Sequence, residues 1–233
     1  MKYKWMLDEV ASAGRENLDT THAASYDRKE DASAKDECGL LIRLGLSKSS
    51  EVLDVGAGTG QFTLTVASAC ARVVAVDVSP IMLEILRRKL AEARPKNVEV
   101  VQAGFLSYEY EGRPFDFVYS RFALHHLPDF WKAMALQRLR RITRPGGVLR
   151  LWDVVYNFSA AEAKDRLQAW CATLPYEAQD GGWTRADIEE HIRDEHSTFT
   201  WLLEPMMERS GFRIDDADYS ADGVFARYVA RAV

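Results

Sequence analysis

The sequence has few cysteines and no long hydrophobic run. Its three cysteines, Cys38, Cys70 and Cys171, lie far apart, so neither a disulfide framework nor a paired metal-binding motif is visible. No run of about 18 apolar residues occurs, and charged residues interrupt the N-terminal segment before an apolar stretch of secretory length. These absences predict a cytoplasmic protein that is neither exported nor membrane-spanning.

An excess of positive charge is also absent. The chain has 30 Lys and Arg residues against 35 Asp and Glu residues, a formal net charge of -5 at pH 7. No net field therefore attracts nucleic acid or an anionic membrane. Basic runs at 87–89 and 138–141 lie on expected helices, where a solvated face is their expected role. With 233 residues, 47% of them hydrophobic, the chain is long enough for one enzyme-sized core.

Five short runs have the composition of buried strands and are spaced to leave room for crossover helices. They cover residues 51–55, 72–78, 97–103, 115–120 and 148–155. Ser79 and Pro80 begin one of the intervening helices, and 129–143 is another, followed by a Pro-Gly-Gly turn at 145–147. This alternation predicts a doubly wound α/β fold with a mostly parallel sheet and a ligand site at the carboxyl ends of its strands.

The remaining segments flank this pattern. Residues 1–36 are polar and predict an N-terminal helical cap on a main domain of residues 37–233. Residues 156–208 are helical in pattern and predict a lid or substrate insert after the fifth strand. Residues 211–220 and 223–233 have the pattern of two closing strands that can pair antiparallel, which brings the expected sheet to seven strands.

The most specific motif is VLDVGAGTGQF at 52–62, in which a buried strand runs through Gly56, Gly58 and Gly60 into a helix. Such glycines allow a tight turn and the close approach of a ligand to the helix N-terminus. Asp77 ends the next strand, where a carboxylate can accept both hydroxyls of an adenosine ribose. The dinucleotide spacing Gly-x-Gly-x-x-Gly is absent, which disfavours a pyrophosphate ligand and an NAD-dependent dehydrogenase.

Four segments closely resemble the ordered motifs of class I S-adenosylmethionine-dependent methyltransferases. They are DVGAGTG at 54–60, VDVSPIML at 76–83, FDFVYSRFALHHLPD at 115–129 and RPGGVLRLWD at 144–153. The resemblance is nearest to the branch that includes the ubiquinone and menaquinone biosynthesis methyltransferases, where Leu-His-His-Leu is also common. It implies a Rossmann-like fold and methyl transfer from S-adenosylmethionine, but not the acceptor, because this branch methylates carbon, nitrogen and oxygen.

The resemblance also implies a set of cofactor-binding residues. Asp54, Gly56, Ala57 and Gly58 would surround the methionine end, and Asp77 would bind the ribose. The adenine would lie against Val78, Met82 and Phe105, next to Gly104, where many relatives carry an acid. Ser120 and Arg121, just past the fourth strand, and Tyr26, in a cap segment that relatives fold over the cofactor, complete the set.

Four residues are candidates for catalysis. His125 and His126 lie on the rim where the methyl group would be presented, and imidazole can remove a proton near neutral pH. Asp153, which ends the fifth strand, and Tyr26 could also orient the acceptor or act as base. Each of the four could instead have a purely structural role. A catalytic base is also not essential, because the in-line displacement mainly needs the acceptor to be held near the methyl group.

His191 and Glu195 are spaced to share a metal ion on one helix face. No third ligand is evident in the sequence, so we expect a solvated charged face and no metal site.

Most of the tryptophans follow residue 130, in or beside the insert, and favour an apolar or aromatic small-molecule acceptor. Two other functions are compatible with the sequence. One is a cofactor-binding regulatory or scaffold protein without activity, and the other is a nucleic-acid methyltransferase. The sequence is also compatible with a homodimer.

Overall fold

One mixed β-sheet organises the computed structural model, which describes residues 4–14, 26–27, 33–177 and 182–233. Its strand order is β3-β2-β1-β4-β5-β8-β7. The strands are β1 Glu51–Val55, β2 Arg72–Asp77, β3 Val98–Gln102, β4 Phe115–Arg121, β5 Thr143–Tyr156, β7 Phe212–Tyr219 and β8 Phe225–Ala232. Strands β1 to β5 are parallel, and β8 pairs antiparallel with both β5 and β7. The expected doubly wound α/β sheet with an antiparallel closing pair is confirmed.

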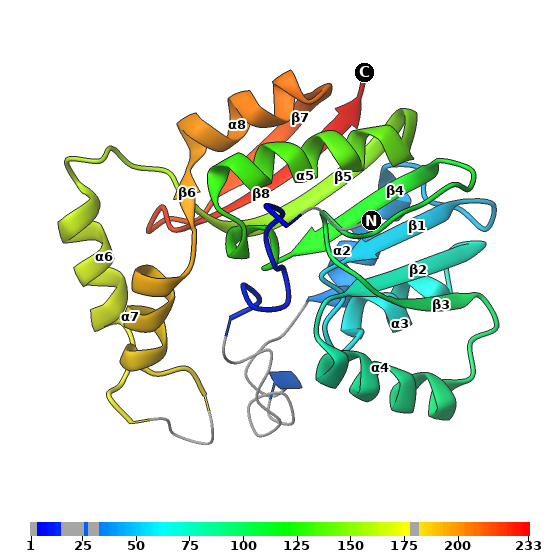
Figure 1. Ribbon diagram of the computed structural model, residues 1–233, viewed down its shortest axis with the longest axis horizontal. Coiled ribbons are helices and arrows are strands. Elements are labelled where there is room, and N and C mark those ends of the chain that lie inside the picture. Colours follow the sequence, from blue (N-terminus) through cyan, green and yellow to red (C-terminus); the bar gives the residue numbers. More distant parts are fainter. Residues whose placement is uncertain (1–3, 15–25, 28–32, 178–181) are drawn as a thin grey trace.

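Helices cover both faces of this sheet (Figure 1). Over residues 33–177 and 182–233 the helices are α2 Ala34–Arg43, α3 Gln61–Ala67, α4 Pro80–Ala93, η1 Leu124–His126, α5 Asp129–Ile142, α6 Ala163–Ala172, α7 Arg185–Asp194 and α8 Thr200–Arg209. Alternate residues of β1 face opposite sides: Val52 packs in the cluster that contains residues of α2 and α3, and Leu53 packs in the cluster that contains residues of α5 and α8. The central strands are therefore largely apolar on both sides, as expected for a sheet buried on both faces.

Strand β5 begins earlier than expected. Helix α5 ends at Ile142 and the strand starts at Thr143, which pairs with Phe115 of β4. The ladder then shifts register between Phe115 and Phe117, and the Pro-Gly-Gly segment at 145–147, exposed at Pro145 and Gly146, lies within this irregularity. The sequence prediction of a separate turn was wrong because the glycines form a bulge inside the strand.

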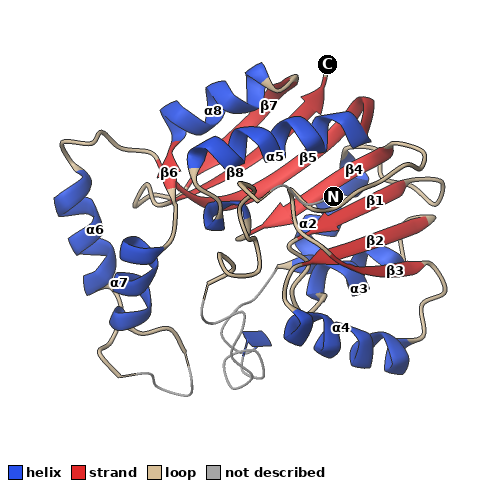
Figure 2. Cartoon of the chain, viewed as in Figure 1, coloured by secondary structure: helices blue, strands red, loops and turns tan. Residues whose placement is uncertain are grey.

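The helical insert is shorter than expected. Leu203 and Met207 of α8 are fully buried in the main core, so this helix belongs to the layer on the sheet. Within residues 156–208, α6 and α7 are the helices that stand apart from the layered body (Figure 2). The segment also contributes β6, Thr198–Phe199, a short strand that pairs with β5 and was not predicted from the sequence.

The N-terminal region differs in part from the predicted helical cap. Residues 4–14 form turns, only Tyr26 and Asp27 are helical between 15 and 32 in the described part, and the rest of 1–32 lies outside the described residues. Helix α2 runs across residue 36. In the part of the chain that the structure describes, no helix is long and apolar enough to cross a membrane.

A buried ion pair fastens α2 to the sheet. Arg150 of β5 donates from Nε and Nη2 to the two carboxylate oxygens of Glu37, at 2.8 and 2.7 Å. Both side chains are at most 7% exposed. Removal of one partner would leave a buried charge without compensation.

Glu37→Ala should therefore lower the free energy of unfolding by about 3–5 kcal/mol, measured by urea denaturation. The double variant E37M/R150L should recover most of this loss, because it removes both charges and retains apolar volume. A single variant as stable as the wild type would show that the pair contributes little.

A second buried carboxyl lies at the end of β1. Asp54 is 2% exposed and accepts a hydrogen bond of 2.5 Å from the Thr63 hydroxyl. Burial, with a smaller contribution from the charge of Asp77, raises the pKa of Asp54 to about 7.

This pKa predicts how stability depends on pH. Because the folded pKa lies above the unfolded value of about 3.9, the native state binds more protons between these two values, and stability falls as pH rises through this range. Asp54→Asn retains the acceptor for Thr63 but does not ionise. We therefore expect the difference between the unfolding free energy of the variant and that of the wild type to increase by up to about 4 kcal/mol from pH 4 to pH 7. Above pH 7 this difference should stay constant. Urea denaturation across this range measures the difference, and a constant difference would contradict it.

Candidate functional site

The glycine loop after β1 is held against the neighbouring strand. The backbone amides of Gly56 and Ala57 both donate to the Val76 carbonyl, at 2.8 and 3.0 Å. Gly56 has a φ of 77°, and a Cβ there would lie 2.3 Å from the Ala123 Cβ. Only glycine fits this position, so the backbone stays close to the ends of β2 and β4.

Asp77 lies beside this loop, as the motif spacing predicts. Its two carboxylate oxygens accept hydrogen bonds of 2.8 Å from the amides of Gly58 and Ser79, and burial raises its pKa. Each oxygen keeps a further lone pair for a ligand. The side chain lines a hollow at the carboxyl ends of the strands.

Most of the expected cofactor-binding residues gather around this hollow and a smaller one next to it. The first is lined by Gly56, Gly58, Asp77, Val78, Gly104, Phe105, Arg121 and Tyr26, among others; the second includes Asp54, Ala57, Gly56, Gly58, Arg121 and Tyr26. We refer to the two together as the cofactor hollow. Ten of the twelve expected residues thus come together from segments that are distant in the chain.

The other two expected residues lie elsewhere. Met82 is 1% exposed and Ser120 is 0% exposed, and neither lines the cofactor hollow. Met82 follows the Ser79 cap of α4, whose hydroxyl accepts from the Met82 amide, and its side chain is in the core. Helical periodicity near a cap places a side chain on a face but does not show whether it reaches a ligand.

Glu9 is a residue of this hollow that the sequence analysis missed. Its buried carboxylate accepts from the Leu106 amide at 2.9 Å and from the Ser107 hydroxyl at 2.6 Å. A Cβ at Gly104 would lie 2.3 Å from Glu9 Oε1, so the glycine makes room for this acid. The only signal in the sequence was a glycine at 104, where many relatives carry an acid of their own.

The Tyr26-Asp27 pair lies beside the glycine loop. Asp27 accepts hydrogen bonds from the Thr59 hydroxyl and from Gln61 Nε2, the latter at 3.1 Å, and forms an ion pair with Lys89. Tyr26 lines the cofactor hollow, as expected for a cap segment folded over it.

A second cavity of about 260 Å³ adjoins the cofactor hollow and is lined by residues from β5, β8 and the loop after β4 and by residues of α6 and α7. Its walls include the aromatic and aliphatic side chains of Phe122, Trp170, Leu174, Trp183, Ile188 and Phe225. Tyr26, Phe122 and His126 line both this cavity and the cofactor hollow. We call it the insert cavity.

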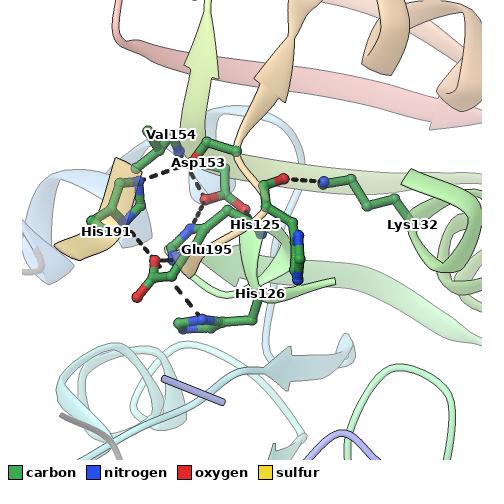
Figure 3. A network of polar contacts seen from close by, with 9 residues as sticks. His125, His126, Lys132, Asp153, Val154, His191 and Glu195 are labelled. Carbon is green, nitrogen blue, oxygen red and sulfur yellow. Dashed lines mark hydrogen bonds and ion pairs between the residues drawn. The ribbon is translucent and has the colours of Figure 1, made fainter. Parts of the chain in front are cut away.

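Five ionisable side chains meet at the junction of the two spaces (Figure 3). His125 Nδ1 lies 2.5 Å from Asp153 Oδ1, and His125 Nε2 lies 3.0 Å from Glu195 Oε2. His191 Nδ1 also contacts Glu195 Oε2, and His126 Nδ1 lies 3.9 Å from the same oxygen. We call His125, His126, His191 and Glu195 the histidine cluster.

The environment shifts the pKa values in this cluster strongly. Burial alone would lower the pKa of His125, but the neighbouring Asp153 and Glu195 carboxylates raise it to about 10. Burial, together with the positive charge of His125, lowers the pKa of His126 to about 3. The pKa of Glu195 falls despite its burial because His125 and His191 donate to it. His125 is therefore a cation between the carboxylates of Asp153 and Glu195.

The expectation of a solvated charged face at His191 and Glu195 was wrong. Their side chains are only 13% and 9% exposed, because α7 turns this face toward the sheet. His125 and His126 reach the same carboxylate from the loop after β4, about 70 residues earlier in the chain. The i, i+4 spacing in the sequence identified His191 and Glu195 as a pair. Only the tertiary structure shows that His125 and His126 lie beside them.

Comparison with known proteins agrees with this geometry. Residues 52–147 match the family model described as a methyltransferase domain. The demethylmenaquinone methyltransferase of Shouchella clausii is 32% identical over 110 residues, which are 46% of this chain and 46% of that protein. The chain thus matches about half the length of this curated relative.

Solved structures share the fold over a greater length. The N-methyltransferase NodS from Bradyrhizobium japonicum WM9, in complex with S-adenosyl-L-homocysteine, aligns over 97% of this chain and 99% of its own, with a TM-score of 0.62 and 17% identity. The [4+2]-cyclase SpnF aligns over 84% of this chain and 80% of its own, with a TM-score of 0.64 and 17% identity.

The family model covers the glycine loop, Asp77 and the Leu-His-His-Leu segment, which build most of the hollow, whereas Glu9 and Tyr26 lie outside the matched residues. Residues 52–147 therefore correspond to a methyltransferase domain, and the chain is distantly similar to the demethylmenaquinone methyltransferases over about half its length.

Proposed function

We propose that this protein transfers a methyl group from S-adenosylmethionine to an apolar or aromatic small molecule in the insert cavity. The observation that carries the proposal is the shared wall of Tyr26, Phe122 and His126 between the two spaces. A methyl group presented from the cofactor hollow at this wall faces an acceptor in the insert cavity.

The contacts of the hollow support the cofactor assignment. Asp77, with an open lone pair on each oxygen, takes the ribose hydroxyls, and the loop at 56–58 with Asp54 takes the methionine end. Val78, Gly104 and Phe105 flank the adenine, and Glu9 brings a carboxylate to that end. The cofactor supplies an activated methyl group on a sulfonium.

The side chains at the junction mainly position the acceptor and exclude water. Both ring nitrogens of His125 are engaged, one by Asp153 and one by Glu195, so His125 is a positioning residue rather than a free base. Asp153 acts through His125. His126 and Tyr26 touch both spaces and are the candidates for direct contact with the reacting atoms.

One observation favours a second candidate function. The solved structure of SpnF has the same fold and is described as a [4+2]-cyclase, so the fold by itself does not specify methyl transfer. A protein that binds the cofactor without transferring its methyl group is therefore the alternative. Formation of a methylated product separates the two, whereas cofactor binding does not.

The cofactor assignment is tested first by calorimetric titration of the purified protein with S-adenosylmethionine and, separately, with NAD. We expect binding of S-adenosylmethionine only. Asp77→Ala should weaken this binding by about 2–3 kcal/mol, because a charged acceptor of two hydroxyls is lost.

Glu84→Ala is the matched control for Asp77→Ala, because Glu84 is an exposed acid on α4, outside the hollow. It should bind as the wild type does. Unchanged affinity of a folded Asp77→Ala variant would refute the ribose role, and binding of NAD would overturn the cofactor itself.

The acceptor assignment is tested by filling the insert cavity. Leu174 lines it, so Leu174→Trp should lower kcat/KM for an accepted substrate by about tenfold or more while leaving S-adenosylmethionine affinity unchanged. Transfer of a labelled methyl group to apolar and aromatic acceptors gives the rate. Ala172→Trp adds the same ring at an exposed position outside the cavity and should have no effect. Equal rates in the two variants would exclude the insert cavity as the acceptor site.

A further inference from the structure

We propose that His125, His126 and Glu195 form a binding site for a divalent first-row transition-metal ion at the junction of the cofactor hollow and the insert cavity. The inference goes beyond methyl transfer and does not depend on it, because it concerns the donor atoms of the chain itself. It rests on the geometry of the histidine cluster in Figure 3.

The donor atoms are spaced as ligands of one ion would be. One imidazole nitrogen from each of His125 and His126 and one oxygen of Glu195 all lie within 4.8 Å of one another. The oxygen lies 3.0 Å from His125 Nε2 and 3.9 Å from His126 Nδ1. Ligands about 2.0–2.2 Å from a tetrahedral ion are roughly 3.3–3.6 Å apart, so small side-chain shifts would admit the ion. The ion would replace the proton between His125 Nε2 and Glu195, which is released to solvent.

The groups around the donors fix their orientation. Asp153 accepts from His125 Nδ1, which leaves Nε2 directed at Glu195. The backbone amides of His125 and Val154 hold the same carboxylate at 3.1 and 2.8 Å. A carboxylate behind a histidine that faces an ion is the usual outer shell of a protein metal site.

His191 completes the arrangement on the α7 side. Its Nε2 is 2.9 Å from the Ser197 hydroxyl, and its Nδ1 contacts the Glu195 oxygen. It therefore holds Glu195 in place. The Glu195 loop is fixed in turn, because the amide of His196 donates to the His125 carbonyl at 2.9 Å and Lys132 donates to the His196 carbonyl.

The donor set selects the class of ion. Imidazole with a single carboxylate suits zinc, iron, cobalt or nickel, whereas magnesium and calcium require mainly oxygen ligands. Two histidines and one carboxylate leave coordination positions open, and His125 and His126 both line the insert cavity. An ion at this place would bind an oxygen, nitrogen or sulfur atom of the acceptor and act on it as a Lewis acid.

The test uses the full chain after removal of metals with a chelator. Titration with Co²⁺ is followed by visible absorption, which reports coordination by nitrogen and oxygen ligands, and Zn²⁺ binding is measured by calorimetry. We expect one equivalent of each ion. Glu195→Gln should weaken binding by about 100-fold or more, since a ligand is lost, and Asp153→Asn by about 10–100-fold, since the outer shell is lost.

Glu189→Gln is the matched control, because Glu189 is an exposed acid on α7 outside the cluster, and its variant should bind as the wild type does. If Glu195→Gln does not fold, as judged by its thermal melt without metal, His126→Gln replaces it. Absence of a Co²⁺ spectrum in the wild type, or equal affinity in a folded ligand variant, would overturn the proposal and leave the cluster as an ion-pair network.

The same metal-free protein is titrated with S-adenosylmethionine. A metal site without cofactor binding would leave this inference standing and refute the proposed function. Cofactor binding and methyl transfer without any metal binding would refute the metal site and support the proposed function.

Discussion

The functional region depends on the hydrogen bonds that hold the glycine loop to β2. The Gly56 and Ala57 amides donate to the Val76 carbonyl, and the Gly58 amide donates to Asp77. These bonds bring the ends of β1 and β2 together and direct the N-terminus of α3 toward the cofactor hollow. Because parallel strands end at the same edge, every other residue of the hollow is placed relative to this loop.

The second half of the site is built at the next strand pair. The loop after β4 carries His125 and His126, and the end of β5 carries Asp153, which holds His125 by its side chain and its backbone. Helix α7 then closes over these groups and contributes Glu195 and His191. The junction of the two spaces is thus made from the carboxyl ends of the strands and from the insert that follows β5.

Burial decides the electrostatic character of this junction. In water, histidines and a glutamate would titrate near their ordinary pKa values. Here His125 and His126 are adjacent in sequence, yet their pKa values move in opposite directions, because only His125 lies directly between two carboxylates. Such divergent shifts in neighbouring groups are typical of functional sites and also of structural ion-pair networks. The same clustering of nitrogen and oxygen donors motivates the proposed metal site.

The sequence by itself determined the parts that depend on local pattern. Apolar runs separated by helical segments predicted the doubly wound sheet, and the spacing of Gly56, Gly58 and Asp77 predicted the nucleoside site, because turn geometry and strand ends are encoded within a few residues. Only the tertiary structure placed Glu9 beside Gly104, Glu37 against Arg150, and Glu195 beside His125. It also assigned α8 to the sheet layer and Pro-Gly-Gly to a bulge in β5. These features join residues that are distant in the chain or depend on which face is buried, and packing rather than local periodicity decides both.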